Sequence, residues 1–241
     1  MNKAMFTNRA SNDDQWVSVA DLMAGLMMVF LFIAVIYAKD ANQRASNVTE
    51  IVTEWQDAEM EIYRALEREF RDDLPIWNAE IERASLTIRF LSPEILFKTG
   101  KADLSDHFKQ VLDDFMPRYI DLLISKFDTK IDEVRIEGHT SSEWLQSIDT
   151  ANAFINNMKL SQARTRTVLE YAINLPEMQY FTPWVIKKVS ANGLSSARLI
   201  TENGVENKKR SRRVEFTIKT KTKEAMFQIL EKVSPAIEKS F

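Results

Sequence analysis

Residues 16–38 read WVSVADLMAGLMMVFLFIAVIYA, an apolar stretch of 23 residues that contains a single acidic side chain, Asp21. A bilayer core of ~30 Å requires about 20 apolar residues in a helix, so this stretch is long enough to span a membrane. A charged side chain in mid-membrane costs about 2.5–3.5 kcal/mol on insertion scales, and an ionisable group kept there is a functional candidate. The stretch therefore predicts a transmembrane helix with one functional carboxyl.

We expect a retained anchor rather than a cleaved signal peptide. The apolar part is longer than the about 7–15 residues that are usual for a signal peptide, and no small-residue cleavage site follows it. The chain has 241 residues with 32 Lys and Arg and 35 Asp and Glu, and its net charge of −3 gives no general reason to expect a nucleic-acid partner. It contains no cysteine, which excludes disulfides, thiolate metal sites and cysteine nucleophiles.

The next segment, residues 40–70, is charged but periodic. Its apolar residues recur at near-helical spacing and form one narrow stripe: Val48, Val52, Trp55, Ile62, Leu66 and Phe70. Two arrangements remain open, since this helix could pack on its own globular domain or pair with a second copy of itself. The pair Leu74-Pro75 ends the pattern.

Beyond this break the sequence predicts alternating strands and helices. Alternating or strand-rich runs predict strands at 86–91, 131–137, 184–190 and 213–220. Helical spacing predicts helices at 104–126, 150–174 and 223–240. We therefore expect an α+β protein with a mixed sheet and helices on one face. The expected division is an N-terminal segment (1–15), a transmembrane helix (16–38), a helical linker (39–73) and a globular domain (74–241).

Four short patterns in the globular part occur in a definite order. They are FKTGKADL (97–104), IEGHTS (136–141), NMKLSQARTRTV (157–168) and SRRVEF (211–216). Together they resemble the OmpA-like peptidoglycan-binding domain, whose hallmarks are F-x-x-x-x-A-x-L, G-H-T-D, N-x-x-L-S-x-x-R-A and N-R-R-V-E. The resemblance covers roughly residues 85–220 and implies a domain that binds the cell wall.

The resemblance implies that Arg164 grips a carboxylate of the peptide stem. A guanidinium group suits this task because its planar fork binds a carboxylate through two parallel hydrogen bonds. Without the flanking pattern, an ion pair on the helix surface would be the simpler interpretation of Arg164. The resemblance places five further residues in the wall-binding site: Asn157, Thr140, Ser141, Leu160 and Arg213.

The sequence departs from the family pattern in the loop, where Ser141 replaces the Asp that pairs with the amine of the ligand. Either Glu143 or Asp149 could replace that acid, or the domain binds the wall weakly or through a different muropeptide. We interpret His139 as a hydrogen-bonding scaffold of the loop, not as a general base or metal ligand. The basic run 208–213 is interpreted as a solvated strand edge rather than a nucleic-acid site.

The membrane segment carries a second resemblance. Residues 19–28, VADLMAGLMM, are similar to the Y-A-D-F-M-T-A-M-M-A pattern of flagellar stator B subunits (MotB-like), and Asp21 falls on the proton-accepting position. Ala20, Ala24 and Gly25 flank it, and small residues allow another helix to approach closely. The resemblance implies a homodimer inside a ring of multi-span A subunits, with a cytoplasmic N-terminus and a periplasmic C-terminal domain in the bacterial inner membrane.

The reduced basic N-terminal segment, the missing loop acid and the compact size make the chain most similar to the B subunits of Zorya anti-phage defence motors. The resemblance implies an ion-driven rotary motor, with protons rather than sodium because few oxygen ligands besides Ser18 flank Asp21. A flagellar stator subunit and a static tether from inner membrane to wall, with Asp21 only a packing contact, remain alternatives. We expect no enzymatic activity, catalytic residue, cofactor or metal.

Overall fold

The computed structural model describes residues 10–91, 93–98, 100–144, 149–222 and 227. The chain divides into two compact units, one formed by residues 1–54 with 226–241 and the other by residues 55–225.

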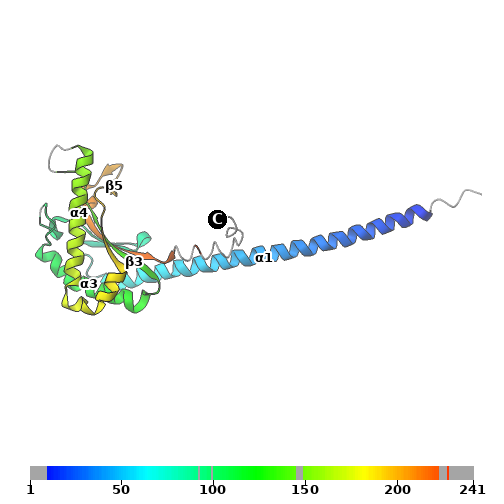
Figure 1. The fold of residues 1–241 in the computed structure, drawn as a ribbon, viewed down its shortest axis with the longest axis horizontal. Helices are drawn as coiled ribbons and strands as arrows, with labels where there is room; N and C mark the ends of the chain where they lie inside the picture. Colours follow the sequence, from blue (N-terminus) through cyan, green and yellow to red (C-terminus); the bar gives the residue numbers. More distant parts are fainter. Residues whose placement is uncertain (1–9, 92, 99, 145–148, 223–226, 228–241) are drawn as a thin grey trace, which may run out of the picture. The chain divides into compact units, whose positions relative to one another are not determined.

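A long helix, α1 (Ala10–Phe70), contains the apolar stretch. The side chains from Trp16 to Tyr37 are exposed in the single chain, which suits contact with lipid or other helices rather than with a core of its own. Among the described residues, α1 is the one helix that is long and apolar enough to cross a membrane. The expected helix over 16–38 and its continuation to residue 70 are confirmed (Figure 1).

The last turns of α1 belong to the second unit and pack into its core. Ala58, Ile62, Leu66 and Phe70 are buried there, whereas Val52 is 38% exposed. The C-terminal part of the apolar stripe therefore packs on its own globular domain, the first of the two arrangements left open by the sequence. After Phe70 the chain turns, and the expected end of the helix is confirmed.

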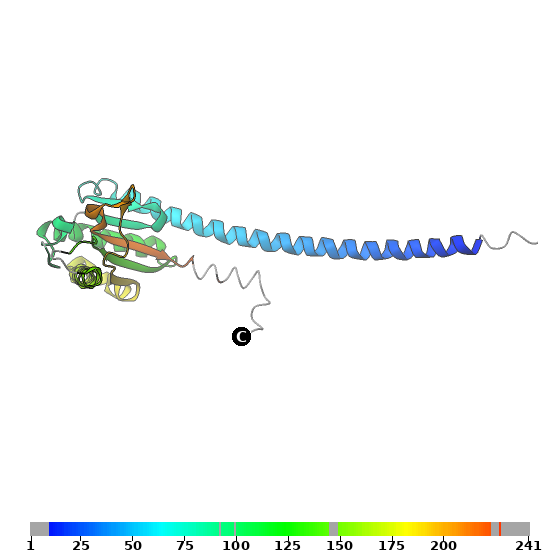
Figure 2. The ribbon, with the colours of Figure 1, turned by 90° about the horizontal axis from the view of Figure 1, so that it is seen from above.

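The second unit contains a five-stranded sheet in the order β1-β2-β7-β3-β4, in which only β3 and β4 are parallel. Figure 2 shows β7 (orange) between its two neighbours. The strands are β1 (Ala79–Glu82), β2 (Thr87–Leu91), β3 (Ile131–His139), β4 (Val189–Gly193) and β7 (Arg213–Thr220), with a separate hairpin of β5 (Thr201–Glu202) and β6 (Val205–Glu206). The helices are η1 (Arg83–Ser85), α2 (Pro93–Leu96), α3 (Asp106–Phe127), α4 (Thr150–Ile173), η2 (Pro176–Phe181), α5 (Thr182–Lys188) and α6 (Lys208–Ser211).

The two faces of the sheet differ in polarity, because successive side chains of a strand point to opposite faces. One row of paired residues across β2, β7 and β3 is apolar: Ile88, Phe216 and Ile136. The adjacent row is charged: Arg89, Glu215 and Glu137. The helices must therefore cover the apolar face.

The core lies between this apolar face and the helices α1, α3 and α4. Its centre is aromatic, with the ring of Phe115 on α3 lying 4.8 Å from Tyr119 and 5.0 Å from Phe216, measured between centroids. Phe70 from α1 joins the same cluster at 5.3 Å from Phe115. An α+β protein with an apolar N-terminal helix, a helical linker and a mixed sheet covered by helices on one face is thus confirmed.

The prediction of a strand over residues 184–190 is wrong for its first part. Residues Thr182–Lys188 form α5, and β4 begins only at Val189. Pro183 stands in the first turn of α5, where its fixed backbone angle favours a helix, and two lysines in the last turn face the negative helix end. The expected terminal helix at 223–240 lies outside the described residues except for Phe227.

Candidate functional site

Helix α4 carries most of the predicted wall-binding residues, and two glycines let it lie close against the sheet. A Cβ atom on Gly193 would lie 2.2 Å from the backbone nitrogen of Gln162, and one on Gly138 would lie 2.9 Å from the carbonyl oxygen of Ser161. These glycines are partners across β3 and β4. The contact fixes the height of α4 above the end of β3, where the predicted binding loop begins.

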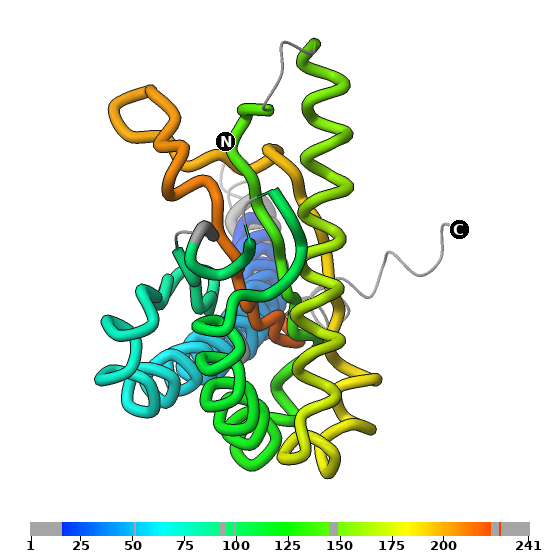
Figure 3. The backbone as a smooth tube through the Cα atoms, turned by 90° about the vertical axis from the view of Figure 1, so that its left-hand side faces the viewer, coloured from blue at the N-terminus to red at the C-terminus, as the bar shows by residue number. Residues whose placement is uncertain are grey.

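Arg164, on α4, is a largely buried cation. The residue is 9% exposed, its Nε donates to the carbonyl oxygen of Lys101 at 3.0 Å, and its guanidinium lies 4.8 Å from the centre of the Phe97 ring. Figure 3 traces α4 (light green) and the 97–104 segment that meets it. Burial, together with the charge of Arg212, lowers the pKa of Arg164 to about 10.

Within the described part of the chain, the guanidinium of Arg164 forms no ion pair. A buried charge without a counter-ion is costly, and in a folded protein it is usually compensated by a partner. The surface ion pair, which the sequence alone left as the simpler interpretation, does not occur among the described residues. A carboxylate ligand would supply the missing partner through the terminal nitrogens of the guanidinium.

The loop after β3 is held to α4 by Asn157. The Asn157 side-chain amide donates to the carbonyl oxygens of Ser141, at 3.3 Å, and Glu143, at 3.2 Å. Both Asn157 and Ser141 are buried, and Leu160, one turn further along α4, is half-buried. Asn157 therefore shapes the loop with its two N–H donors, and its side-chain oxygen is the part left for a ligand.

Thr140, at the start of the same loop, has an unsatisfied hydroxyl. Its backbone N–H donates to the carbonyl oxygen of Ser195 at 2.9 Å, but its buried Oγ1 has no hydrogen-bond partner among the described residues. Buried polar atoms are nearly always paired, and an exception requires an explanation. A bound ligand or water would provide one.

The two acids considered as replacements for the missing loop acid are already engaged. Glu143 forms an ion pair with Lys208, and this contact lowers the pKa of Glu143. Asp149 caps α4 by accepting from the backbone nitrogen of Asn152 at 3.0 Å, and this bond lowers the pKa of Asp149.

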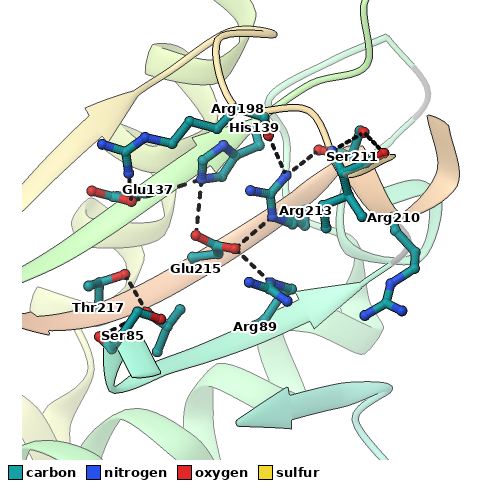
Figure 4. A network of polar contacts seen from close by, with 12 residues as sticks. Ser85, Arg89, Glu137, His139, Arg198, Arg210, Ser211, Arg213, Glu215 and Thr217 are labelled. Carbon is teal, nitrogen blue, oxygen red and sulfur yellow. Dashed lines mark hydrogen bonds and ion pairs between the residues drawn. The ribbon is translucent and has the colours of Figure 1, made fainter. Parts of the chain in front are cut away.

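The predicted site residue Arg213 lies on the polar face of the sheet, in a buried network shown in Figure 4. Its Nε donates to Oε1 of Glu215 at 2.6 Å, and Arg89 donates to the same oxygen at 2.6 Å. Burial favours the neutral acid, but contacts with His139 and Arg213 outweigh it and hold the pKa of Glu215 below its ordinary range. The structure thus separates Arg213 from the residues grouped around Arg164.

Arg212 is the residue that the sequence analysis missed. It precedes the strand residue Arg213, which pairs with His139 at the end of β3, so it lies beside the start of the 140–144 loop. Because alternate side chains point to the same face, Arg212 lies on the same face as Val214, which the helices cover. The positive charge of Arg212 contributes to the lowered pKa of Arg164. The motif SRRVEF contained this signal, since neighbouring residues of an extended backbone point to opposite faces, and Arg212 is extended directly before β7.

The buried network around Arg213 (Figure 4) also contains a group with metal-ligating atoms, formed by Glu137, His139 and Glu215. His139 is fully buried, its Nε2 lies 3.2 Å from Oε2 of Glu215, and burial lowers its pKa. Three guanidinium groups already balance the two carboxylates: Arg89 and Arg213 on Glu215, and Arg198 on Glu137 at 3.2 Å. A divalent cation would add uncompensated charge, so this arrangement suits a structural ion network.

In the first unit, Asp21 lies on α1 within the apolar stretch, with its side chain exposed. Ala20, Ala24 and Gly25 lie on the same part of the helix, and a Cβ atom on Gly25 would meet no atom within 4 Å. This surface leaves room for a second helix to approach the carboxyl.

No protein-family model matches the chain. Among solved structures, it is similar to a MotB-like protein from Desulfovibrio vulgaris (TM-score 0.48, 20% identity, 72% of this chain and 99% of that one). Others are the cell wall anchor of the T6SS from Pseudomonas aeruginosa (0.45, 22%, 65% and 97%) and the periplasmic domain of Helicobacter pylori MotB (0.41, 16%, 60% and 83%).

Among curated proteins, the Zorya protein ZorB of Escherichia coli strain Crooks is 41% identical over 221 residues, which cover 91% of this chain and 94% of the relative. The similarity therefore includes both the apolar helix and the globular domain. The chain belongs to the ZorB family of Zorya proteins.

Proposed function

We propose that this chain is the stator B subunit of an ion-driven motor of the bacterial inner membrane that takes part in Zorya anti-phage defence. The observation that carries the proposal is the identity to ZorB over nearly the whole chain, which favours a defence motor over the flagellar alternative. In this arrangement residues 1–15 are cytoplasmic, 16–38 span the membrane and the domain after the 39–73 linker is periplasmic. The role requires no covalent chemistry.

The membrane half of the proposal rests on Asp21. Two copies of the chain place two such carboxyls inside a ring of multi-span A subunits, and each takes up a proton from the periplasmic side and releases it to the cytoplasm. Moving one charge across the membrane is worth ~2.3 kcal/mol per 100 mV. This is close to the about 2.5–3.5 kcal/mol that a charged side chain costs in mid-membrane, so cycling between the two protonation states is feasible.

The wall-binding half rests on Arg164. Its buried guanidinium, without an acidic partner among the described residues, supports the binding of a carboxylate of the peptidoglycan stem. Asn157, Thr140, Ser141 and Leu160 form the loop and helix surface beside it. Holding the globular domains to the wall keeps the B dimer fixed while the ring turns.

Substituting Asp21 with Asn tests the motor against a static tether. The amide keeps the shape of the side chain but cannot carry a proton, so we expect the D21N protein to assemble and protection from phage, measured as plating efficiency, to be lost. D40N is the matched control, because Asp40 forms an exposed ion pair with Arg44 outside the apolar stretch. Full protection by D21N would refute ion transport and leave the tether.

Substituting Arg164 with Ala tests anchoring. We expect co-sedimentation of the full chain with purified sacculi to fall at least about tenfold, the scale of one hydrogen bond to a charged group. R166A is the matched control, because Arg166 lies on the same helix with its side chain 83% exposed. R164K keeps the charge but not the planar fork and should bind weakly while remaining folded. Unchanged sedimentation of R164A would refute the assigned site.

A further inference from the structure

The part of α1 that follows the apolar stretch carries a narrow apolar stripe. Between residues 39 and 57 the sequence is mostly polar or charged, and its apolar residues, apart from Ile51, recur at alternating steps of four and three residues: Ala41, Ala45, Val48, Val52 and Trp55. This is the spacing of the a and d positions of a coiled coil, which face a partner helix. We call these five residues the linker seam.

The described part of the chain leaves most of the linker seam uncovered. The side chains of Ala41, Ala45 and Val52 are exposed, Val52 at 38%, and Val48 is half-buried. Lipid cannot cover the far end, because Val52 lies roughly 21 Å beyond Ala38, the end of the apolar stretch, at about 1.5 Å per residue. An apolar stripe on a helix in water favours burial against another protein surface.

The linker seam ends where the helix begins to pack on its own domain. The next position in the same spacing after Trp55 is Glu59, whose carboxylate accepts a hydrogen bond from the hydroxyl of Thr220 at 2.9 Å. Ala58 and Ile62, on either side of Glu59, are buried in the core of the second unit. The apolar stripe of α1 thus has two parts, and the first of them is available to a partner.

The charges around the linker seam fit a second copy of the same helix. Membrane insertion gives both copies the same direction, so they meet in parallel and equivalent residues face each other. Arg44, which flanks the seam, then lies opposite Thr49 of the second copy and forms an ion pair with Asp40 of its own helix at 2.7 Å. The other charged residues of this segment fall on the outer positions of the heptad: Lys39, Asp40, Glu50, Glu54 and Asp57. No like charges therefore meet across a parallel pair.

The same spacing continues without a break into the apolar stretch. Counted back from Ala41 in steps of three and four residues, it passes through the following residues: Ala38, Ala34, Leu31, Met27, Ala24 and Ala20. The last two are the small residues that flank Asp21. A helix that pairs along the linker seam is therefore in phase with the surface beside the carboxyl.

We infer that the linker seam pairs with the seam of a second copy as a short parallel coiled coil, which holds the two Asp21 carboxyls at the same depth. This rests on the proposed function, because membrane insertion makes the two helices parallel. Each chain then uses the stripe of α1 twice, up to Trp55 for the second copy and from Ala58 for its own domain.

Disulfide crosslinking tests this pairing, because the chain has no cysteine of its own. The full chain is expressed with a single cysteine, V48C or V52C in the seam, and E50C, on the outer face of the same turn, is the matched control. After mild oxidation of the membranes, we expect covalent dimers of V48C and V52C to exceed those of E50C at least several-fold. The reason is that a disulfide requires Cα atoms within about 7 Å of each other.

A second substitution tests whether the apolar contact itself holds the pair. V52K combined with V48C places two like charges against each other in the seam and should remove most of the crosslinked dimer. T53K combined with V48C adds the same charge on the outer face and should leave the yield unchanged.

The outcomes separate this inference from the proposed function. Equal crosslinking of V48C, V52C and E50C, or an unchanged yield with V52K, would overturn the coiled coil and leave the proposed roles of Asp21 and Arg164 standing. Crosslinking confined to the seam, together with full phage protection by D21N, would support the coiled coil and overturn the proposed motor.

Discussion

Substituting Gly193 with Ala should push α4 away from the sheet. The added Cβ atom would lie 2.2 Å from the backbone nitrogen and 2.6 Å from the Cα atom of Gln162. Both are backbone atoms of a long helix, so no side-chain rotation can relieve the clash. The helix or the strand must move, and Arg164 and Asn157 move with α4.

The cost can be judged from overpacking in other cores, which is typically about 1–3 kcal/mol and occasionally more. Because the obstacle here is helix backbone, we expect about 3 kcal/mol. For a unit of this size, running from residue 55 to 225, each kcal/mol lowers the Tm by about 2–4 °C, so the expected fall is about 6–12 °C.

Thermal unfolding of the full chain followed by tryptophan fluorescence measures this fall. N192A is the matched control, because Asn192 neighbours Gly193 on the other face of β4 and its substitution adds no volume. N192A also removes the part-buried hydrogen bond from Asn192 to Ser190, so we expect it to lower the Tm by about 2–4 °C, the scale of one hydrogen bond of about 1 kcal/mol. A G193A protein equally close to the wild type would refute the close contact between α4 and β4.

Three further predictions concern buried polar groups and can be checked by chemical unfolding. E215Q should lose about 3–5 kcal/mol, because Arg213 keeps a buried charge without an acidic partner and Arg89 keeps only its ion pair with Glu80. Since the folded pKa of Glu215 lies below its ordinary 4.5, this difference should persist above about pH 5 and shrink as the pH falls further; a constant difference down to pH 3 would contradict it. Burial lowers the pKa of His139 below its ordinary 6.5, so the neutral side chain contributes its full stabilisation above that pH and this stabilisation is lost as the pH falls. H139Q should therefore reduce the loss of unfolding free energy between about pH 7.5 and 5.5. Y119F should be neutral or stabilising by about 1 kcal/mol, since the buried hydroxyl of Tyr119 has no partner among the described residues; a clear loss of stability would argue for a missed partner.

The sequence predicted those elements whose pattern is strong and local. The alternation in 86–91, 131–137 and 213–220 identified β2, β3 and β7, because each has one apolar and one polar face. Strand β1 (Ala79–Glu82) was missed, since four residues at a sheet edge give too short a pattern. Residues 184–188 begin with strand-favouring side chains, Trp, Val and Ile, but a proline in the first turn starts a helix there.

The site could be predicted only where one motif holds the whole signal. Arg164 and Asn157 lie on one helix at fixed spacing, so their shared surface follows from the sequence. The roles of Arg212 and Arg213 depend on the register of β7 against β3 and on which face α4 covers, and these are long-range properties. The absence of an ion pair at Arg164 among the described residues could not be predicted either, because it depends on which cation Glu143 pairs with, and that cation is Lys208. The domain bounds and the role of Asp21 stay predictions.

The burial of the end of α1 has a mechanical consequence for a wall anchor. A pull on the linker reaches Ile62, Leu66 and Phe70, which are completely buried, before it reaches the edge strand β1. The force is thus distributed over side chains packed between α3 and the sheet. Strand β1, which pairs only with β2, is protected from separating from the sheet. Tension along the linker would have to extract these three side chains together before the sheet itself carries any load.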